Sequence, residues 1–109
     1  MTKRTALELL HDEYGLSSRR IAEVCKIDIA GFARIERGVV LPKRETAHDL
    51  HVFYRGVVPL GVIYDPAHKE SLAWWKKAAY SGELATAIAR ILKEHPKLSV
   101  RRLDARRRR

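Results

Sequence analysis

Arginine and lysine side chains give this chain its most evident chemistry, because they outnumber the acidic side chains by 22 to 13. The resulting net charge is +9. More than half of this excess lies in residues 97–109, which contain seven basic residues and one aspartate. Guanidinium and ammonium groups pair with phosphates, and a basic excess of this kind is typical of proteins that bind nucleic acids. The charge therefore predicts a polyanionic partner.

Candidate catalytic and metal-binding groups are few. His48 and His51 flank Asp49 in a predicted helix, but a metal site needs three or four converging ligands, and no further histidine or cysteine has a suitable spacing. The sequence contains no nucleophile motif and no glycine loop that could hold a phosphate. The single cysteine, Cys25, lies on a predicted apolar stripe and is expected to be a core residue. We therefore expect no enzyme activity, no metal and no cofactor.

Four arginines in the first half of the chain lie in two predicted short helices separated by a tight turn: Arg19, Arg20, Arg34 and Arg37. Ser17 or Ser18 can cap the first helix, because a serine hydroxyl accepts a hydrogen bond from a free backbone N–H. The apolar residues that follow at spacings of three and four predict one buried stripe on this helix. They are Ile21, Val24 and Cys25.

The turn at residues 26–27 leads to the second helix, for which Asp28 is a suitable N-cap. Phe32 and Ile35 form its inner, apolar face, and Gly38 can adopt the left-handed conformation that ends helices. Two short helices joined in this way indicate a helix-turn-helix, a unit that places its second helix in the major groove of DNA. The residues left on the outer side of that helix are Ile29, Ala30, Ala33, Arg34 and Arg37.

Over roughly residues 7–65 the chain resembles the Cro/cI-type (XRE, lambda-repressor-like) family of DNA-binding domains. The resemblance implies an all-α, five-helix domain. The apolar spacing of the sequence itself predicts the first, fourth and fifth helices at about residues 3–13, 45–54 and 59–64. The segments that carry the resemblance are Gly15-Leu16-Ser17, Ile21-Ala22-Glu23, Arg34-Ile35-Glu36-Arg37-Gly38, Pro42 with Glu45-Thr46, and Val57-Val58-Pro59-Leu60.

The resemblance implies which residues contact double-stranded DNA. Ile29, Ala30, Ala33 and Arg34 would face base edges, and Arg34 is the candidate for reading guanine because its planar fork matches O6 and N7 together. Ile29 and Ala30 depart from the polar residues often found there, but they can pack on thymine methyl groups. Contacts to the DNA backbone, which position the protein without reading sequence, would come from Ser18, Arg19, Arg37, Lys43 and Arg44.

The resemblance also implies a pair between the first and third helices. Where several phage repressors place an arginine and a glutamate, this chain has His11 and Glu36. A carboxylate favours the protonated form of a neighbouring histidine. We therefore expect the two side chains to join these helices; the alternative is a simple exposed histidine.

Beyond residue 65 the family pattern fades, and the sequence predicts three regions: a helix-turn-helix domain at 1–65, a helical extension at 66–96 and a basic, flexible tail at 97–109. The extension contains a helix at Glu70–Tyr80 and another that Ser81 could cap. Its apolar stripe either packs on its own domain or forms a two-fold dimer contact. The residues proposed for a dimer contact are Leu60, Trp74, Trp75, Ile88 and Ile91.

The tail ends in four consecutive arginines, Arg106, Arg107, Arg108 and Arg109. Like charges repel and apolar residues are scarce, so we expect disorder there. Such an arm can neutralise phosphates or enter a narrow minor groove. The alternative is a terminus that only improves solubility.

These observations predict a sequence-specific transcription regulator, a repressor that binds a palindromic operator as a homodimer. One alternative is an antitoxin-type module, whose C-terminal helices bind a protein partner while the helix-turn-helix controls its own gene. Another is an architectural or RNA-binding protein dominated by its tail. A lone cysteine suggests no oxidising compartment, and no apolar run reaches the roughly 18 residues that a membrane span needs. With no signal peptide evident, we expect a cytoplasmic protein and no membrane partner.

Overall fold

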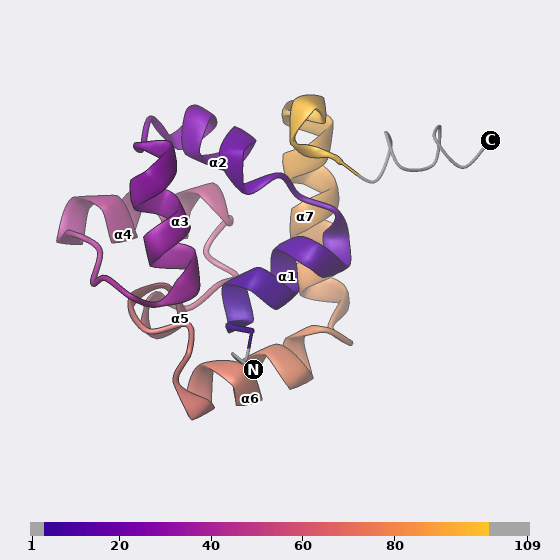
Figure 1. The fold of residues 1–109 in the computed structure, drawn as a ribbon. Helices are drawn as coiled ribbons and strands as arrows, with labels where there is room; N and C mark the ends of the chain where they lie inside the picture. Colours follow the sequence, from indigo (N-terminus) through magenta and orange to yellow (C-terminus); the bar gives the residue numbers. More distant parts are fainter. Residues whose placement is uncertain (1–3, 101–109) are drawn as a thin grey trace.

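The structure, a computed structural model, describes residues 4–100 and forms seven α-helices, one short 3-10 helix and no strand within that range (Figure 1). The prediction of an all-α chain is confirmed for these residues. None of their helices is long and apolar enough to cross a membrane. The elements are α1 (Ala6–Tyr14), α2 (Ser18–Cys25), α3 (Ile29–Arg37), α4 (Arg44–Phe53), α5 (Leu60–Tyr64), α6 (Lys69–Ala78), α7 (Gly82–Glu94) and the 3-10 helix η1 (Pro96–Leu98).

Local hydrogen bonds set the ends of α1. Thr5 forms a capping box with Glu8, in which each side chain accepts from the other residue's backbone N–H. Gly15 ends the helix with a φ of 64°, a left-handed conformation that costs glycine little. The helix therefore begins after the predicted residue 3, because the capping box fixes its start.

Both N-caps predicted for α2 and α3 are present. Ser17, rather than Ser18, precedes α2, and its hydroxyl accepts from the N–H of Arg20. Asp28 precedes α3, and its carboxylate accepts from the N–H of Gly31 at 2.9 Å. These bonds satisfy N–H groups that the first turn of a helix leaves free.

Left-handed residues end both helices. Lys26 ends α2 at a φ of 58°, a conformation that non-glycine residues rarely adopt. Gly38 ends α3 at a φ of 76°, where glycine is favoured. Only residues 26–28 separate the two helices, and α2 and α3 pack directly on each other.

The buried stripe of α2 differs from the predicted one. Ile21 is buried and Cys25 is half-buried, but Val24 is exposed, and the prediction for it was wrong. Ala22 is buried in its place. Successive helical residues turn by about 100°, so Ile21, Ala22 and Cys25 share one side, while Val24 lies beside it.

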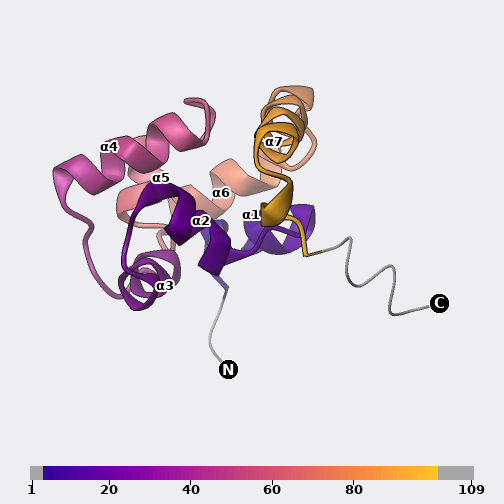
Figure 2. The same cartoon turned by 90° about the horizontal axis from the view of Figure 1, so that it is seen from above.

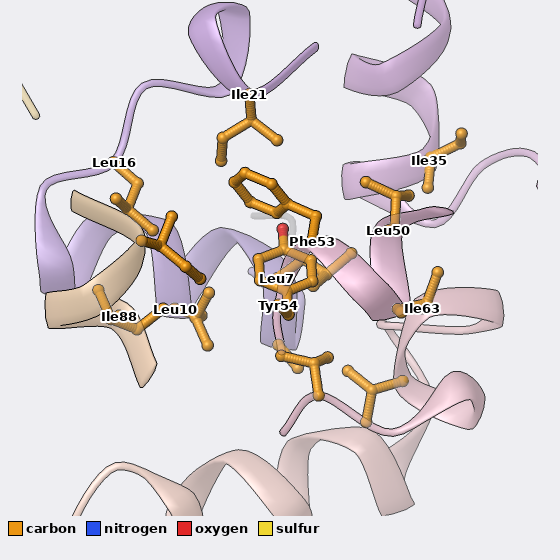
Figure 3. Packing of buried hydrophobic residues seen from close by; sticks show 14 of the residues in the cluster. Leu7, Leu10, Leu16, Ile21, Ile35, Leu50, Phe53, Tyr54, Ile63 and Ile88 are labelled. Atoms are coloured by element: carbon orange, nitrogen blue, oxygen red, sulfur yellow. The ribbon is translucent and has the colours of Figure 1, made fainter. Parts of the chain in front are cut away.

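A continuous apolar core joins the first and last helices of the described chain. Figure 3 shows Leu10 and Ile88 together on one side of the view, and Leu50 and Ile63 on the other. Leu7, from α1, lies between these groups and is fully buried. The α1 helix therefore lies within the core, where it packs on α3, α5 and α6.

The helices α6 and α7 share this core, although the sequence predicts a separate extension at residues 66–96. Trp75, Leu84, Ile88 and Ile91 belong to the same buried cluster as the residues of α1. Ser81 accepts from the N–H of Glu83 at the start of α7, so a new helix begins there and α6 does not continue into it. Figure 1 shows α6 and α7 on two sides of α1.

The segment after α7 is also packed, although the flexible tail was predicted to start at residue 97. Leu98 is fully buried, and its carbonyl oxygen accepts from the N–H of Ser17 at 2.7 Å. Val100 donates its N–H to the carbonyl oxygen of Gly15, also at 2.7 Å. The prediction of a flexible tail is therefore wrong for residues 97–100, because η1 and the residues after it pair with the α1–α2 connection. The rest of the predicted tail lies outside the described residues.

Leu98→Ala should lower the free energy of unfolding by about 2–5 kcal/mol, because it leaves a cavity at a fully buried site. The matched control is Leu41→Ala, whose side chain is 75% exposed and whose loss should change stability by less than about 0.5 kcal/mol. Urea denaturation of both variants measures the difference. Equal stabilities would contradict the packed position of Leu98.

Candidate functional site

A buried polar network forms where the first four helices meet, and Glu36 is its centre. His11 Nδ1 lies 2.5 Å from Glu36 Oε2, so the two side chains of the predicted pair are brought together. The other ring nitrogen, Nε2, lies 2.6 Å from the hydroxyl of Tyr54. Ser18 donates its hydroxyl to Glu36 Oε2 at 2.7 Å, and Thr5 donates to the backbone oxygen of Glu36 at 2.5 Å. We call these five residues the Glu36 network.

The chemistry of these groups fixes most of the donors. An ionised carboxylate can only accept, so His11 Nδ1 carries the proton that it shares with Glu36. The Tyr54 hydroxyl serves either form of the ring, since it can accept from a protonated imidazole or donate to Nε2 of a neutral one. Every buried side-chain nitrogen and oxygen in the described residues has a hydrogen-bond partner. The network is therefore satisfied although it is buried.

Burial and charge act in opposite directions on Glu36. Burial alone would raise the pKa of its carboxyl, but the hydrogen bond and charge of His11, with smaller contributions from Ser18 and Arg4, outweigh burial and lower this pKa. Burial, and then the charges of Glu36 and Cys25, raise the pKa of Tyr54 well above its ordinary value. Glu36 is thus ionised and Tyr54 protonated at neutral pH.

The sequence placed Ser18 on the DNA-facing side and did not single out Thr5 or Tyr54 for this network. The Ser18 hydroxyl is instead directed to Glu36. The Tyr54 hydroxyl completes the network from the end of α4. A polar atom on an otherwise apolar face was the available signal, because a buried hydroxyl needs a partner.

The outer face of α3 lies opposite its buried residues. Ile29 is 44% exposed, and Ala30 and Arg34 are also exposed. Ala33 is half-buried, so it lies at the edge of this face. The face combines apolar surface with one guanidinium group near its middle.

Five exposed cations were predicted to contact bases or phosphates, and one of them, Arg34, lies on this face. The ion pairs found in residues 4–100 that involve arginine use Arg4, Arg20 and Arg55, and none uses these five. Their charges are therefore available to an external anion. The five are Arg19, Arg34, Arg37, Lys43 and Arg44.

The residues proposed for a dimer contact divide into two groups. Trp75, Ile88 and Ile91 are buried in the core of the same chain, so they do not present a surface to a second subunit. This corrects their placement at a dimer contact: the structure follows the alternative of packing within the chain. Leu60 is exposed and Trp74 is half-buried, so these two remain accessible. The predicted DNA contacts of Arg106–Arg109 lie outside the described residues.

Other reactive groups have ordinary structural roles. His51 Nδ1 donates to the carbonyl oxygen of Val58 at 2.8 Å. Burial, and then the charge of Asp49, raise the pKa of Cys25 to about 11, so its thiol is protonated at neutral pH. Across residues 4–100, no three histidine, cysteine or acidic side chains are grouped so that they could hold a metal ion.

Comparison with known proteins gives no match for this chain among protein-family models, curated proteins or solved structures. Its function is therefore inferred from its own residues. The features that bear on function are the exposed outer face of α3, the exposed cations that form no ion pair within residues 4–100, and the partly buried network that holds α3 in place.

Glu36→Gln should lower the free energy of unfolding by about 1.5–3 kcal/mol at neutral pH, because it removes a buried charge that accepts two hydrogen bonds. The pKa of Glu36 is lowered in the folded state, so ionised Glu36 stabilises the fold above the ordinary pKa of 4.5. This stabilisation is lost as the pH falls through the folded pKa. The deficit of the variant should therefore shrink below pH 4.5.

Urea denaturation between neutral pH and about pH 3 measures this deficit. The matched control, Glu45→Gln, changes an exposed carboxylate and should cost less than about 0.5 kcal/mol. A double-mutant cycle with His11→Gln should give a coupling of about 0.5–3 kcal/mol. A deficit that is constant with pH, or the absence of coupling, would contradict the Glu36 network.

Proposed function

We propose that this chain is a sequence-specific DNA-binding regulator of the Cro/cI type, in which α2, the turn at residues 26–28 and α3 form a helix-turn-helix and α1–α5 form the DNA-binding domain. The observation that carries the proposal is the outer face of α3, which is exposed although the opposite face of the same helix is buried. The short turn and the direct packing of α2 on α3 support the same assignment.

The dimensions of α3 suit the major groove. A helix with its side chains is about 10–12 Å across, and the major groove, about 12 Å wide, admits an element of that diameter. Gly31 carries no side chain on the exposed first turn, where an added Cβ would contact only the Asp28 side chain. The backbone of α3 can therefore approach the base edges closely.

In this arrangement Arg34 reads a guanine through a bidentate hydrogen bond to O6 and N7. Ile29 and Ala30, which have no polar side-chain atoms, pack on thymine methyl groups. Ala33, at the edge of the face, makes a smaller apolar contact. The half-site is therefore expected to contain one guanine beside thymines.

Phosphate contacts come from the cations on both sides of this face. Arg19 lies at the start of α2, Arg37 at the end of α3, and Lys43 and Arg44 at the start of α4. Such contacts supply affinity and register but no sequence information. Ser18 acts differently from the family expectation, because its hydroxyl orients Glu36 inside the domain.

The proposed regulator acts as a repressor. A homodimer on an inverted repeat would occlude a promoter, and each α3 would enter the major groove one helical turn from the other. Leu60 and Trp74 are the accessible members of the predicted contact surface. Because α6 and α7 belong to the same core as α1, binding of a separate protein by an independent C-terminal module is the less favoured alternative.

Selection of bound sequences from a random duplex library at about physiological salt tests this function. We expect an inverted repeat with half-sites about one helical turn apart. Arg34→Ala should weaken binding to the selected site by about 1–3 kcal/mol and relax the preference at one base pair. The matched control is Arg90→Ala, an exposed arginine on α7, which lies on the other side of the molecule from α3 (Figures 1 and 2).

The two variants separate the possible outcomes. Loss of specificity with Arg34→Ala but not with Arg90→Ala supports a major-groove reader. An equal, small effect of both variants would point to non-specific binding by charge. The absence of any enriched sequence would overturn the proposal and favour a protein partner or the arginine-rich segment.

A further inference from the structure

The connection from α3 to α4 exposes three consecutive apolar side chains, Val39, Val40 and Leu41, which we call the apolar loop. Their exposed fractions are 63%, 40% and 75%. Figures 1 and 2 show this connection at the periphery of the molecule. A run of exposed apolar residues adds nothing to folding, because none of the three side chains reaches the core.

Both ends of the apolar loop are fixed. Val39 donates its N–H to the carbonyl oxygen of Arg34 at 3.0 Å, which ties it to the last turn of α3. A Cβ on Gly38 would lie 3.3 Å from the Cβ of Ala67, so the backbone packs closely there. Pro42, at the other end, is buried. The backbone is fixed at both ends of the loop, so the three side chains occupy defined positions on the surface.

Cations flank the apolar loop on both sides. Arg37 precedes it, Lys43 and Arg44 follow it, and no acidic residue lies between Glu36 and Glu45. The carboxylate of Glu36 is engaged by His11 and Ser18, so it does not neutralise these cations. An apolar patch between unpaired positive charges is complementary to a surface that alternates anionic and apolar groups.

We propose that the apolar loop packs on the deoxyribose faces of the DNA strand that borders the major groove, while Arg37, Lys43 and Arg44 contact the phosphates on either side. This inference rests on the proposed function. If the outer face of α3 lies in the major groove, the apolar loop, which directly follows the last turn of α3, lies beside the groove and can reach the sugar–phosphate strand at its edge. That strand presents apolar sugars between phosphates.

The charge pattern disfavours a second copy of the chain as the occupant of the loop. A two-fold contact through Val39–Leu41 would bring the flanking cations of one subunit against those of the other, and like charges repel. A polyanion would instead attract these flanking cations. An anionic lipid surface has the same charge but is the weaker candidate, because three side chains bury little area in a bilayer.

The proposed contact divides the affinity into two measurable parts. Phosphate contacts set the slope of log K against log salt, about 0.9 for each phosphate neutralised. Contacts between apolar side chains and sugars release no counterions. The apolar loop should therefore contribute the same factor to the affinity at every salt concentration.

The test uses the full chain and a duplex carrying its selected site. The variant Val39→Thr/Val40→Thr/Leu41→Asn keeps the side chains near their original size but makes them polar. We expect its Kd to rise about tenfold at each salt concentration, with an unchanged salt slope. Arg37→Ala should instead lower the slope by about one. Val52→Thr, which changes an exposed valine on α4, is the matched control and should leave the Kd unchanged.

Circular dichroism melting of each variant shows that the fold is kept, as expected for exposed positions. If the wild type binds its selected site and the loop variant binds it with the same Kd, this inference is overturned and the proposed function is retained. A lower salt slope in the loop variant would also overturn it. Failure of the wild type to bind any duplex is a failure of the proposed function instead.

Two further measurements identify a different occupant of the apolar loop. Loss of self-association in sedimentation, with DNA affinity per monomer retained, would assign the loop to a second copy. Loss of binding to vesicles of phosphatidylserine and phosphatidylcholine, with DNA affinity retained, would assign it to a lipid surface. Either result overturns the DNA contact.

Discussion

The position of α3 depends on one buried carboxylate. Glu36 lies on α3, yet its partners come from three other places in the chain: His11 on α1, Ser18 on α2 and, through the imidazole ring, Tyr54 at the end of α4. A buried charge is costly unless it is paired and hydrogen-bonded, so only an arrangement that brings these groups together is favourable. The apolar core brings the helices together, and the Glu36 network selects their positions relative to one another. The exposed face of α3 acquires its orientation from the bonds made by the opposite side of the helix.

Features that depend on nearby residues could be predicted from the sequence. Ser17, Asp28 and Gly38 mark helix ends because caps act within one turn of the chain, and the structure has these residues at the ends of α2 and α3. Val24 shows where such reasoning fails. Its spacing fitted an apolar stripe, but which side of a two-turn helix is buried depends on the helices that cover it. The packed segment around Leu98 was missed for the same reason, because its partners are at the α1–α2 connection, at the other end of the described chain.

The candidate site was predicted in outline and not in detail. The residues of the outer face of α3 follow from helical periodicity and the family resemblance, and most of them are exposed. His11 and Glu36 could be paired only through the resemblance, since no local pattern joins α1 to α3. Thr5 and Tyr54 were not foreseen because their hydroxyls act through tertiary contacts. The apolar loop was not singled out from the sequence. Its composition is visible there, but its exposure depends on the packing of Gly38 and Pro42 at its two ends.

The bonds between the α1–α2 connection and the segment after α7 have a consequence for the order of events during synthesis. The N–H of Ser17, at the start of α2, receives its partner only when Leu98 has been translated and η1 has docked. Until then a nascent chain that already contains α1–α5 lacks the cover that α7 and Leu98 give to Leu10 and Leu16. The N-terminal end of α2 can complete its hydrogen bonds only after Leu98 has been made, although the helix itself lies far earlier in the chain.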